Sequence, residues 1–126
     1  MRKNDQIAYY VPVRRFGEFH REEVKGYCYH AEDEGDDFYF MIRKLGKGWQ
    51  VEEYGTGLKV GGNYDSLRVA AANIRFMIIY HDLLGTIRRT HKIKLLRDGG
   101  LLNPGDPGKL FPSCIYEVPD PDRKEE

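Results

Sequence analysis

The amino-acid sequence predicts an α+β domain in which an antiparallel sheet of four or five strands packs on one long helix. Residues 6–62 alternate apolar and polar side chains in short runs separated by glycine-containing turns, which is typical of hairpin strands. Residues 64–84 instead repeat apolar side chains every three or four positions, the spacing of an amphipathic helix. A short basic helix and an extended C-terminal tail complete the predicted fold.

The predicted strands differ in how many faces they bury. In the third, Phe38, Phe40 and Ile42 share one face, whereas Tyr39 and Met41 share the other. Because both faces are apolar, this strand is predicted to be central and covered on both sides. The five strands are expected at residues 6–13, 23–32, 38–45, 49–55 and 56–62.

The long helix carries more apolar surface than one sheet can bury. It is expected to begin after Asn63 or Asp65, because either side chain can accept hydrogen bonds from the first helical amides. It is expected to end at Gly85, a residue that suits the left-handed cap position. One apolar stripe faces the sheet; the second must be covered by the C-terminal segment, a second copy of the chain or a partner. This second stripe is a predicted interface made of Val69, Phe76, Ile79, Tyr80 and Leu83.

The segment after the helix is strongly basic. Residues 86–97 contain no acid, and their periodicity is compatible with a helix or a strand, of which we favour a helix. Five of the six prolines lie at or after residue 104, and residues 109–119 are expected to add an edge strand. We therefore expect an α+β domain at 1–100 and a partly packed extension at 101–126 with a mobile end. The cations of the basic segment are Arg88, Arg89, Lys92, Lys94 and Arg97.

The charge balance excludes two broad functions. The chain has 20 basic and 20 acidic residues, so it is neither a generally basic nucleic-acid binder nor a strongly acidic nucleic-acid mimic as a whole. No apolar run reaches the length of a membrane span, and the first residues lack the apolar core of a signal peptide. With two cysteines expected as free thiols, the sequence predicts a cytoplasmic protein without a membrane partner.

Motifs for catalysis and cofactors are incomplete. Cys28 and His30 share a strand face, but a nucleophilic site needs an orienting group and oxyanion donors, which no motif supplies. Glu32 extends this face into a three-residue stripe, but the second ligand pair of a zinc site is missing. The glycine-rich run "GTGLKVGG" at 55–62 fits neither the Walker pattern nor the dinucleotide-binding fingerprint, the two motifs that bind phosphate in this way. We therefore predict no enzyme activity, metal or cofactor.

An acidic loop is the first candidate partner-binding surface. It holds five acids in six positions, and their offsets do not fit a calcium loop. The basic segment 86–97 is a second candidate surface, for a nucleic acid or an acidic partner. Together the acidic loop and the basic segment give the neutral chain two opposed poles of opposite charge. Frequent aromatic residues add anchors of the kind that interfaces use. These features predict protein binding or self-association as a homodimer. The acids are Glu32, Asp33, Glu34, Asp36 and Asp37.

The hairpin followed by "GGNYDSLRVAAANI" at 61–74 resembles the end of a double-stranded-RNA-binding domain. That family opens its last helix with a lysine-rich stretch that contacts phosphates, whereas Arg68 is the one basic residue at the matching positions 65–68. The same ββα shape resembles the partial fold of HicB-type antitoxins. These resemblances imply an alternative function, a nucleic-acid-binding regulator that uses residues 86–97.

The chain as a whole resembles the small accessory proteins of phages and mobile elements, of the anti-CRISPR type. The likeness lies in its short, aromatic-rich and motif-poor sequence. It implies a non-enzymatic inhibitor that occupies the surface of a nuclease effector. The acidic loop 32–37 would then be the surface that contacts the effector.

Overall fold

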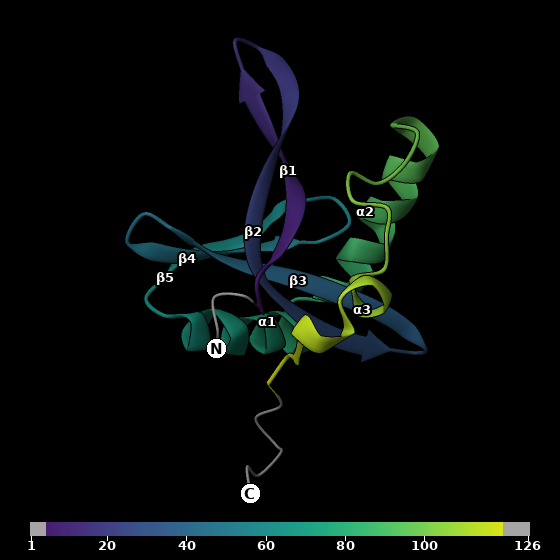
Figure 1. Ribbon diagram of the computed structural model, residues 1–126. Coiled ribbons are helices and arrows are strands. Elements are labelled where there is room, and N and C mark those ends of the chain that lie inside the picture. Colours follow the sequence, from purple (N-terminus) through teal and green to yellow (C-terminus); the bar gives the residue numbers. More distant parts are fainter. Residues whose placement is uncertain (1–4, 120–126) are drawn as a thin grey trace, which may run out of the picture.

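Figure 1 shows the computed structural model, which describes residues 5–119. It confirms the α+β class. The strands are Ile7–Arg15 (β1), Glu18–Asp33 (β2), Asp36–Leu45 (β3), Gly48–Glu53 (β4), Lys59–Tyr64 (β5) and Ile115–Glu117 (β6). The helices are Leu67–Tyr80 (α1), Leu83–Arg97 (α2) and Pro107–Leu110 (α3), and a 3-10 turn, Pro112–Cys114 (η2), precedes β6. No helix among these residues combines the length and hydrophobicity needed to cross a membrane.

The strands follow one another in space in the order β1-β2-β3-β4-β5, and each neighbouring pair is antiparallel. β2 is long enough to serve two partners: its first half pairs with β1 and its second half with β3. The change of partner falls at Gly26, where a Cβ would stand 2.9 Å from the Ile42 carbonyl oxygen. Glycine permits this close crossing of two backbones. β6 pairs in parallel with β2 at Cys28–His30.

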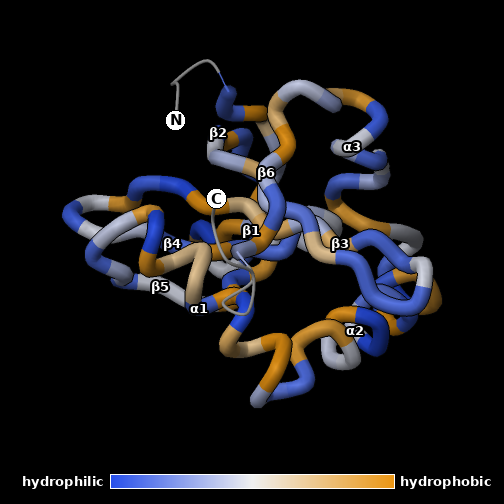
Figure 2. Tube along the Cα trace, turned by 90° about the horizontal axis from the view of Figure 1, so that it is seen from below, coloured by the Kyte–Doolittle hydropathy of each residue, from blue (hydrophilic) through white to orange (hydrophobic). Residues whose placement is uncertain are grey.

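The sheet separates two hydrophobic cores. One lies between β2–β4 and helices α1 and α2, and the other lies between the opposite face of the sheet and β1. Phe40, Met41 and Ile42 of β3 have no exposed surface, which confirms that this strand is central and covered on both sides. Figure 2 shows hydrophobic residues gathered where the strands cross, whereas the β2–β3 turn is hydrophilic. Each such large apolar side chain contributes about 1.5–3 kcal/mol when fully buried.

The prediction of one helix over 64–84 is wrong, because the chain forms two helices that meet at Asp82. α1 begins after Ser66, whose side chain accepts a hydrogen bond from the Val69 amide, so neither predicted cap residue is used. Asp82 adopts a left-handed backbone conformation with φ of 49°, which ends α1 and redirects the chain. The new direction brings Leu84 and Ile87 into the helix-side core.

Gly85 therefore has a different role from the predicted helix stop. It lies in the first turn of α2, where a Cβ would stand 2.5 Å from Oδ1 of Asp82. The absence of a side chain at Gly85 leaves this space to the Asp82 carboxylate. The basic segment 86–97 lies within α2, in agreement with the favoured helix.

The segment after α2 folds back over both halves of the sheet. Asn103 accepts a hydrogen bond from the Tyr10 amide at 2.8 Å and donates to the carbonyl oxygens of Tyr10 at 2.8 Å and Tyr54 at 2.7 Å. Val118 is buried in the helix-side core, and β6 forms within the predicted edge-strand region. The predicted mobile end at 120–126 lies outside the described residues.

The three hydrogen bonds of Asn103 generate a stability prediction. We expect Asn103→Ala to lower the free energy of unfolding by about 2–4 kcal/mol, because it leaves the backbone groups of Tyr10 in β1 and of Tyr54, just after β4, without these partners. Urea denaturation measures this change. Pro104→Ala, at the exposed neighbouring position, is the matched control and should cost far less. Equal losses in the two variants would show that the loop, and not the amide side chain, holds this segment.

Candidate functional site

The acidic loop and the basic segment meet in space through Arg88. The Arg88 guanidinium lies 3.0 Å from Asp33 Oδ2 and 3.1 Å from Asp36 Oδ2, and its Nη2 also donates to the Asp33 carbonyl oxygen at 2.9 Å. The same group lies over the Phe38 ring, 5.0 Å from its centroid. The expectation of two opposed poles is therefore wrong, because part of each charged segment is neutralised by the other.

The remaining acids of the loop have different surroundings. Asp37 Oδ1 lies 2.7 Å from Nε2 of His30, whereas the side chains of Glu32 and Glu34 are exposed. Glu34 has a φ of 53° in the tight turn between β2 and β3. Three of the five carboxylates are thus occupied within the chain, and the surface offered to a partner is narrower than the sequence indicates.

The other cations of α2 are also partly neutralised. Arg89 lies 3.4 Å from Asp82, and Lys94 lies 3.1 Å from Asp98. These are exposed ion pairs of the kind that stabilise little, but they lower the local positive charge. Within residues 5–119, the exposed cations of this segment that form no ion pair are Lys92 and Arg97. The nucleic-acid role of the segment stays a prediction.

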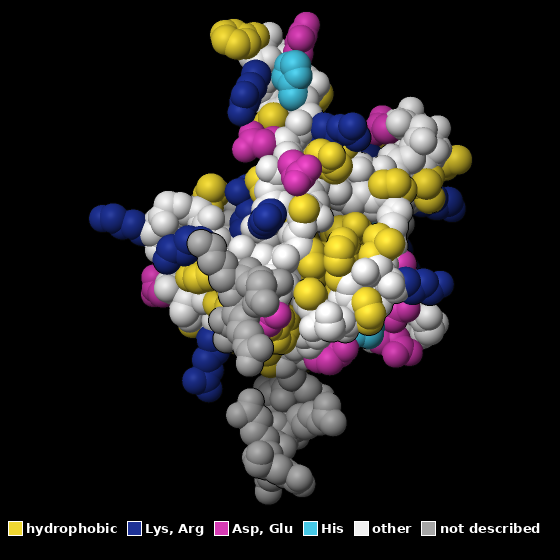
Figure 3. All heavy atoms as spheres, viewed as in Figure 1, with side chains coloured by type: hydrophobic (Ala, Val, Ile, Leu, Met, Phe, Trp, Pro, Cys, Tyr) yellow, Lys and Arg dark blue, Asp and Glu magenta, His cyan; other side chains and the backbone are white. Residues whose placement is uncertain are grey.

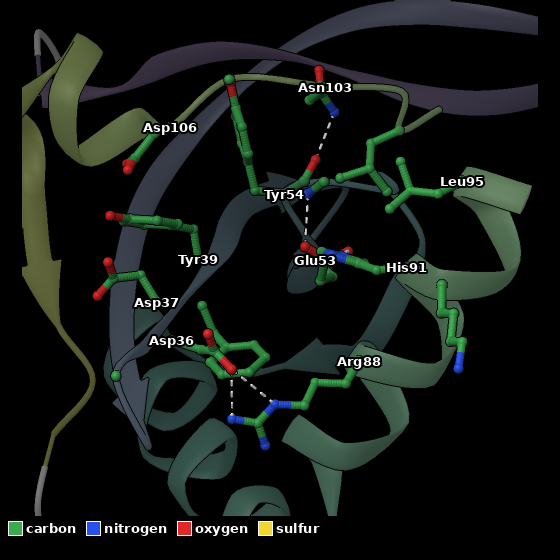
Figure 4. Close-up of a pocket in the computed structure, with 16 residues that line it drawn as sticks. Asp36, Asp37, Tyr39, Glu53, Tyr54, Arg88, His91, Leu95, Asn103 and Asp106 are labelled. Carbon is green, nitrogen blue, oxygen red and sulfur yellow. Dashed lines mark hydrogen bonds and ion pairs between the residues drawn. The ribbon is translucent and has the colours of Figure 1, made fainter. Parts of the chain in front are cut away.

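A cleft of about 620 Å³ opens beside Arg88, between the ends of β3 and β4, helix α2 and the 101–106 loop. Figure 4 shows its walls: Tyr39, Tyr54 and Asp106 on one side and side chains of α2 on the other. Asp106 caps α3 by accepting a hydrogen bond from the Gly108 amide at 2.9 Å. Burial and then the Asp106 carboxylate raise the pKa of Tyr39, so its hydroxyl stays protonated.

Glu53 is the buried charge at the base of this cleft. Its carboxylate accepts hydrogen bonds from the Gly55 amide at 2.7 Å, the Thr56 amide at 3.0 Å and the Thr56 hydroxyl at 2.9 Å. His91 Nε2 reaches it from α2 at 2.7 Å. Burial alone would raise the pKa of Glu53, but His91 and the other donors outweigh it, so the pKa lies below its usual range. Glu53 therefore fastens α2 to β4 as an ionised carboxylate.

The Glu53–His91 pair resembles two members of a catalytic triad, but the third is missing from the cleft. No serine, threonine or cysteine is among the described residues that line it. Cys28, the sequence candidate for a nucleophile, is wholly buried in the core beneath β1, and burial raises the pKa of its thiol to about 12. A protonated, buried thiol is neither a nucleophile nor a metal ligand.

His30 joins three strands on the outer edge of the sheet. Besides the Asp37 contact on β3, its Nδ1 lies 2.9 Å from both carboxylate oxygens of Glu117 on β6. Only the imidazolium form can donate from both ring nitrogens. Partial burial lowers the pKa of His30, but the two carboxylates outweigh this effect and hold the pKa above its ordinary value of 6.5.

The stripe of Cys28, His30 and Glu32 is the sequence candidate for a metal site, and these contacts describe the surroundings of its central residue. Both His30 nitrogens are occupied by carboxylates, and Cys28 is buried. Within residues 5–119 no group of three or more His, Cys, Asp or Glu side chains is arranged to hold a metal ion.

The predicted interface stripe is exposed along α1. Phe76 and Tyr80 keep 49% and 69% of their surface exposed, and their rings lie 4.9 Å apart. Val69 and Ile79 are exposed as well. The prediction that Leu83 belongs to this exposed interface is wrong. Leu83 lies beyond the break at Asp82, is partly buried, and packs against the helix-side core.

The exposed residues of α1 have the spacing of a helix-pairing surface. Val69, Ala72, Phe76 and Ile79 succeed one another by three, four and three positions, which is the a/d repeat of a coiled coil. We name these four residues and Tyr80 the α1 seam. The C-terminal segment reaches this helix at Arg75, whose Nε donates to the Pro119 carbonyl oxygen at 3.2 Å.

Comparisons of the chain with protein-family models, curated proteins and solved structures find no match. The site is therefore defined by its residues alone. Sequence reasoning missed Glu53, His91, Asn103 and Asp106, because each becomes informative only through a partner far along the chain. The glycines and threonine after Glu53, at 55–57, were the local sign of a turn that can hold a buried carboxylate.

The His30 contacts predict a pH dependence of stability. Because the folded pKa is raised above 6.5, the contribution of His30 is complete below that pH and is lost as the pH rises through the folded pKa. We expect the stability advantage of the wild type over His30→Gln to shrink across this range in chemical denaturation. His20→Gln, on the exposed end of the β1–β2 hairpin, should leave the profile unchanged. An advantage that grows with pH would contradict the double carboxylate contact.

Proposed function

We propose that the chain is a small non-enzymatic protein-binding module that self-associates through the α1 seam. The observation that carries this proposal is an exposed apolar stripe on a helix whose opposite face is already packed. Ala70, Ala71 and Ile74 of α1 are buried against the sheet, so the helix needs no further contact to hold its place. The seam is thus surplus to folding, and exposed apolar patches of this kind mark interaction sites.

A second copy of the chain fits the seam by size. Suppose that two α1 helices pair antiparallel about a two-fold axis that passes the seam at the height of residue 74. Val69 then lies opposite Ile79 of the other copy, and Ala72 lies opposite its Phe76. The small alanine leaves room for the large ring, as knobs-into-holes packing requires. Such an interface is isologous, because the same surface is used twice.

The charges at the ends of α1 also suit antiparallel pairing. Arg68 is exposed at the start of the helix, and Asp82, which also lies 3.4 Å from Arg89, is exposed just after its end. In the antiparallel arrangement each arginine approaches the aspartate of the other copy. A parallel arrangement instead places like charges together, which is unfavourable.

Self-association can be measured by sedimentation velocity. We expect the wild type to form dimers and Phe76→Asp to weaken association by roughly 30-fold or more, the effect of losing a hot spot of about 2 kcal/mol. Leu96→Asp, which adds the same charge at an exposed leucine of α2 outside the seam, should leave the dimer intact. A wild type that stays monomeric at 100 µM, taken as roughly the upper end of a useful affinity, would overturn the dimer.

We propose that the partner of this module is a nuclease effector, whose surface the module occupies. The resemblance to anti-CRISPR proteins supports this class, and the exposed carboxylates of the acidic loop supply charge that a phosphate-binding surface would attract. Since Arg88 already neutralises Asp33 and Asp36, the proposal now rests mainly on Glu32 and Glu34.

A cleavage assay tests this partner class. We expect purified chain to slow target-DNA cleavage by a susceptible CRISPR effector, and the double variant Glu32→Lys/Glu34→Lys to lose roughly 10-fold or more in inhibitory potency, since like charges then oppose the contact. Glu23→Lys, on the β1–β2 hairpin, is the control for a change of net charge. Inhibition that is unchanged by the double variant would remove the acidic loop from the interface.

A further inference from the structure

The distal halves of β1 and β2 form an arm that projects from the body of the protein. Figure 1 shows these strands rising beyond the sheet, with α2 on the same side of the molecule. In Figure 3 the end of the arm carries hydrophobic side chains close to basic and acidic ones. We name residues 10–25 the arm. No side chain of residues 14–23 belongs to either hydrophobic core, so these side chains are available to contact a ligand.

The two faces of the arm differ in chemistry, as the strand register shows. On one face Arg14 pairs across the strands with Phe19, and its guanidinium lies over that ring at 4.5 Å. Arg21 lies over the Tyr10 ring at 4.6 Å on the same face. Neither arginine forms an ion pair within residues 5–119.

The opposite face of the arm is internally neutralised. Arg15 bonds to Glu22 at 3.0 Å, and His20 lies 3.8 Å from Glu18. On the aromatic face, by contrast, Arg14 and Arg21 lie over aromatic rings and form no ion pair with the described part of the chain. Guanidinium groups held in this way can bind an external anion.

The tip adds an aromatic side chain in an unfavourable backbone conformation. Phe16 has a φ of 53°, is followed by Gly17 with a φ of 79°, and is fully exposed. A bulky residue in the left-handed region costs roughly 1 kcal/mol or more relative to glycine or asparagine, which turns of this type prefer. Neither folding nor solubility is served by this choice.

The basic-aromatic face also forms one wall of a cleft of about 670 Å³. From the arm it is lined by Pro12, Phe19 and Arg21 of this face and by His20 of the neighbouring register position. Lys94 and Asp98, which are paired with each other, line it at the end of α2. Its remaining apolar lining comes from Leu58, Leu101 and Leu102. The cleft therefore places the Arg21 guanidinium beside aromatic and aliphatic side chains.

We propose that this cleft and the basic-aromatic face of the arm bind single-stranded nucleic acid. Single strands are recognised by cations that track the phosphates together with aromatic rings on which bases stack. Arg14 and Arg21 supply the first, and Phe19 supplies the second, with Phe16 beyond it at the tip.

The alternative ligands fit less well. An acidic polypeptide would use the arginines but leave the aromatic and leucine surfaces unmatched. An anionic membrane is a broad surface that would not enter a cleft between the arm and the end of α2. The inference is independent of the proposed function, because none of these residues belongs to the α1 seam or the acidic loop.

The test is fluorescence anisotropy with labelled 12-nucleotide oligo(dT) and oligo(U) at several salt concentrations. Two phosphate contacts, from Arg14 and Arg21, give a slope of log affinity against log salt of about −1.4. We expect Arg21→Glu and Phe19→Ala each to weaken binding by about 10-fold or more. Arg15→Glu is the matched control on the neutralised face and should change the affinity less than 2-fold. Binding of either oligonucleotide supports the site, and the two separate DNA from RNA.

Several outcomes would overturn the assignment. Circular dichroism and thermal unfolding first establish that each variant is folded; should Phe19→Ala unfold, Phe19→Leu replaces it. No binding of either oligonucleotide at 20 mM salt, where phosphate contacts are strong, excludes the site. An equal loss in Arg15→Glu shows attraction by overall charge only. Equal affinity for poly-glutamate or for anionic vesicles, unaffected by the Phe19 substitution, assigns the face to an acidic polypeptide or to a membrane.

Discussion

The structure depends on one constraint, which is that β3 is apolar on both faces. A strand with Phe40 and Ile42 on one side and Met41 on the other cannot leave either side in water. Helices α1 and α2 cover the first side, and β1 covers the second. The length of β2 and its crossing at Gly26 follow, because one strand has to pair with β3 and also carry β1 across the opposite face.

Buried carboxylates then fix the elements that this arrangement brings together. Glu53 binds α2 through His91, and Glu52 accepts hydrogen bonds from Arg43 at 2.9 Å and from the Tyr9 hydroxyl of β1 at 2.6 Å. Each carboxylate is fully partnered, and no buried side-chain polar atom in the described part of the chain lacks a hydrogen bond. The three candidate interaction surfaces, which are the α1 seam, the acidic loop and the arm, all lie on the outside of this core.

Local patterns predicted five strands and the two stripes of α1, because period-two and period-3.6 repeats depend on neighbouring residues alone. The bounds predicted for two strands, 23–32 and 56–62, were wrong, since β2 begins at Glu18 and β5 is Lys59–Tyr64. Local patterns did not predict the break between α1 and α2 at Asp82. The residues around it are compatible with a helix, and the change of direction becomes understandable only once Leu84 and Ile87 are seen in the helix-side core. The same limit explains Arg88, whose acidic partners lie more than fifty residues earlier. Asn63, Asp65 and Ser66 could all cap a helix, and only packing selected Ser66.

The bond between Asn103 and Tyr10 has a consequence for how the chain is made. Its partners are 93 residues apart, and β6 reaches β2 across a similar separation. Contacts of such long range form late, since they close the largest loops. During synthesis the β1–β2 hairpin can form early from its own turn and pack on Met41 and Tyr54, but its bonds to Asn103 wait until the 101–106 loop has left the ribosome. The first strand of the chain is thus among the last to be secured, and until then its apolar face depends on the nascent sheet alone for protection from aggregation.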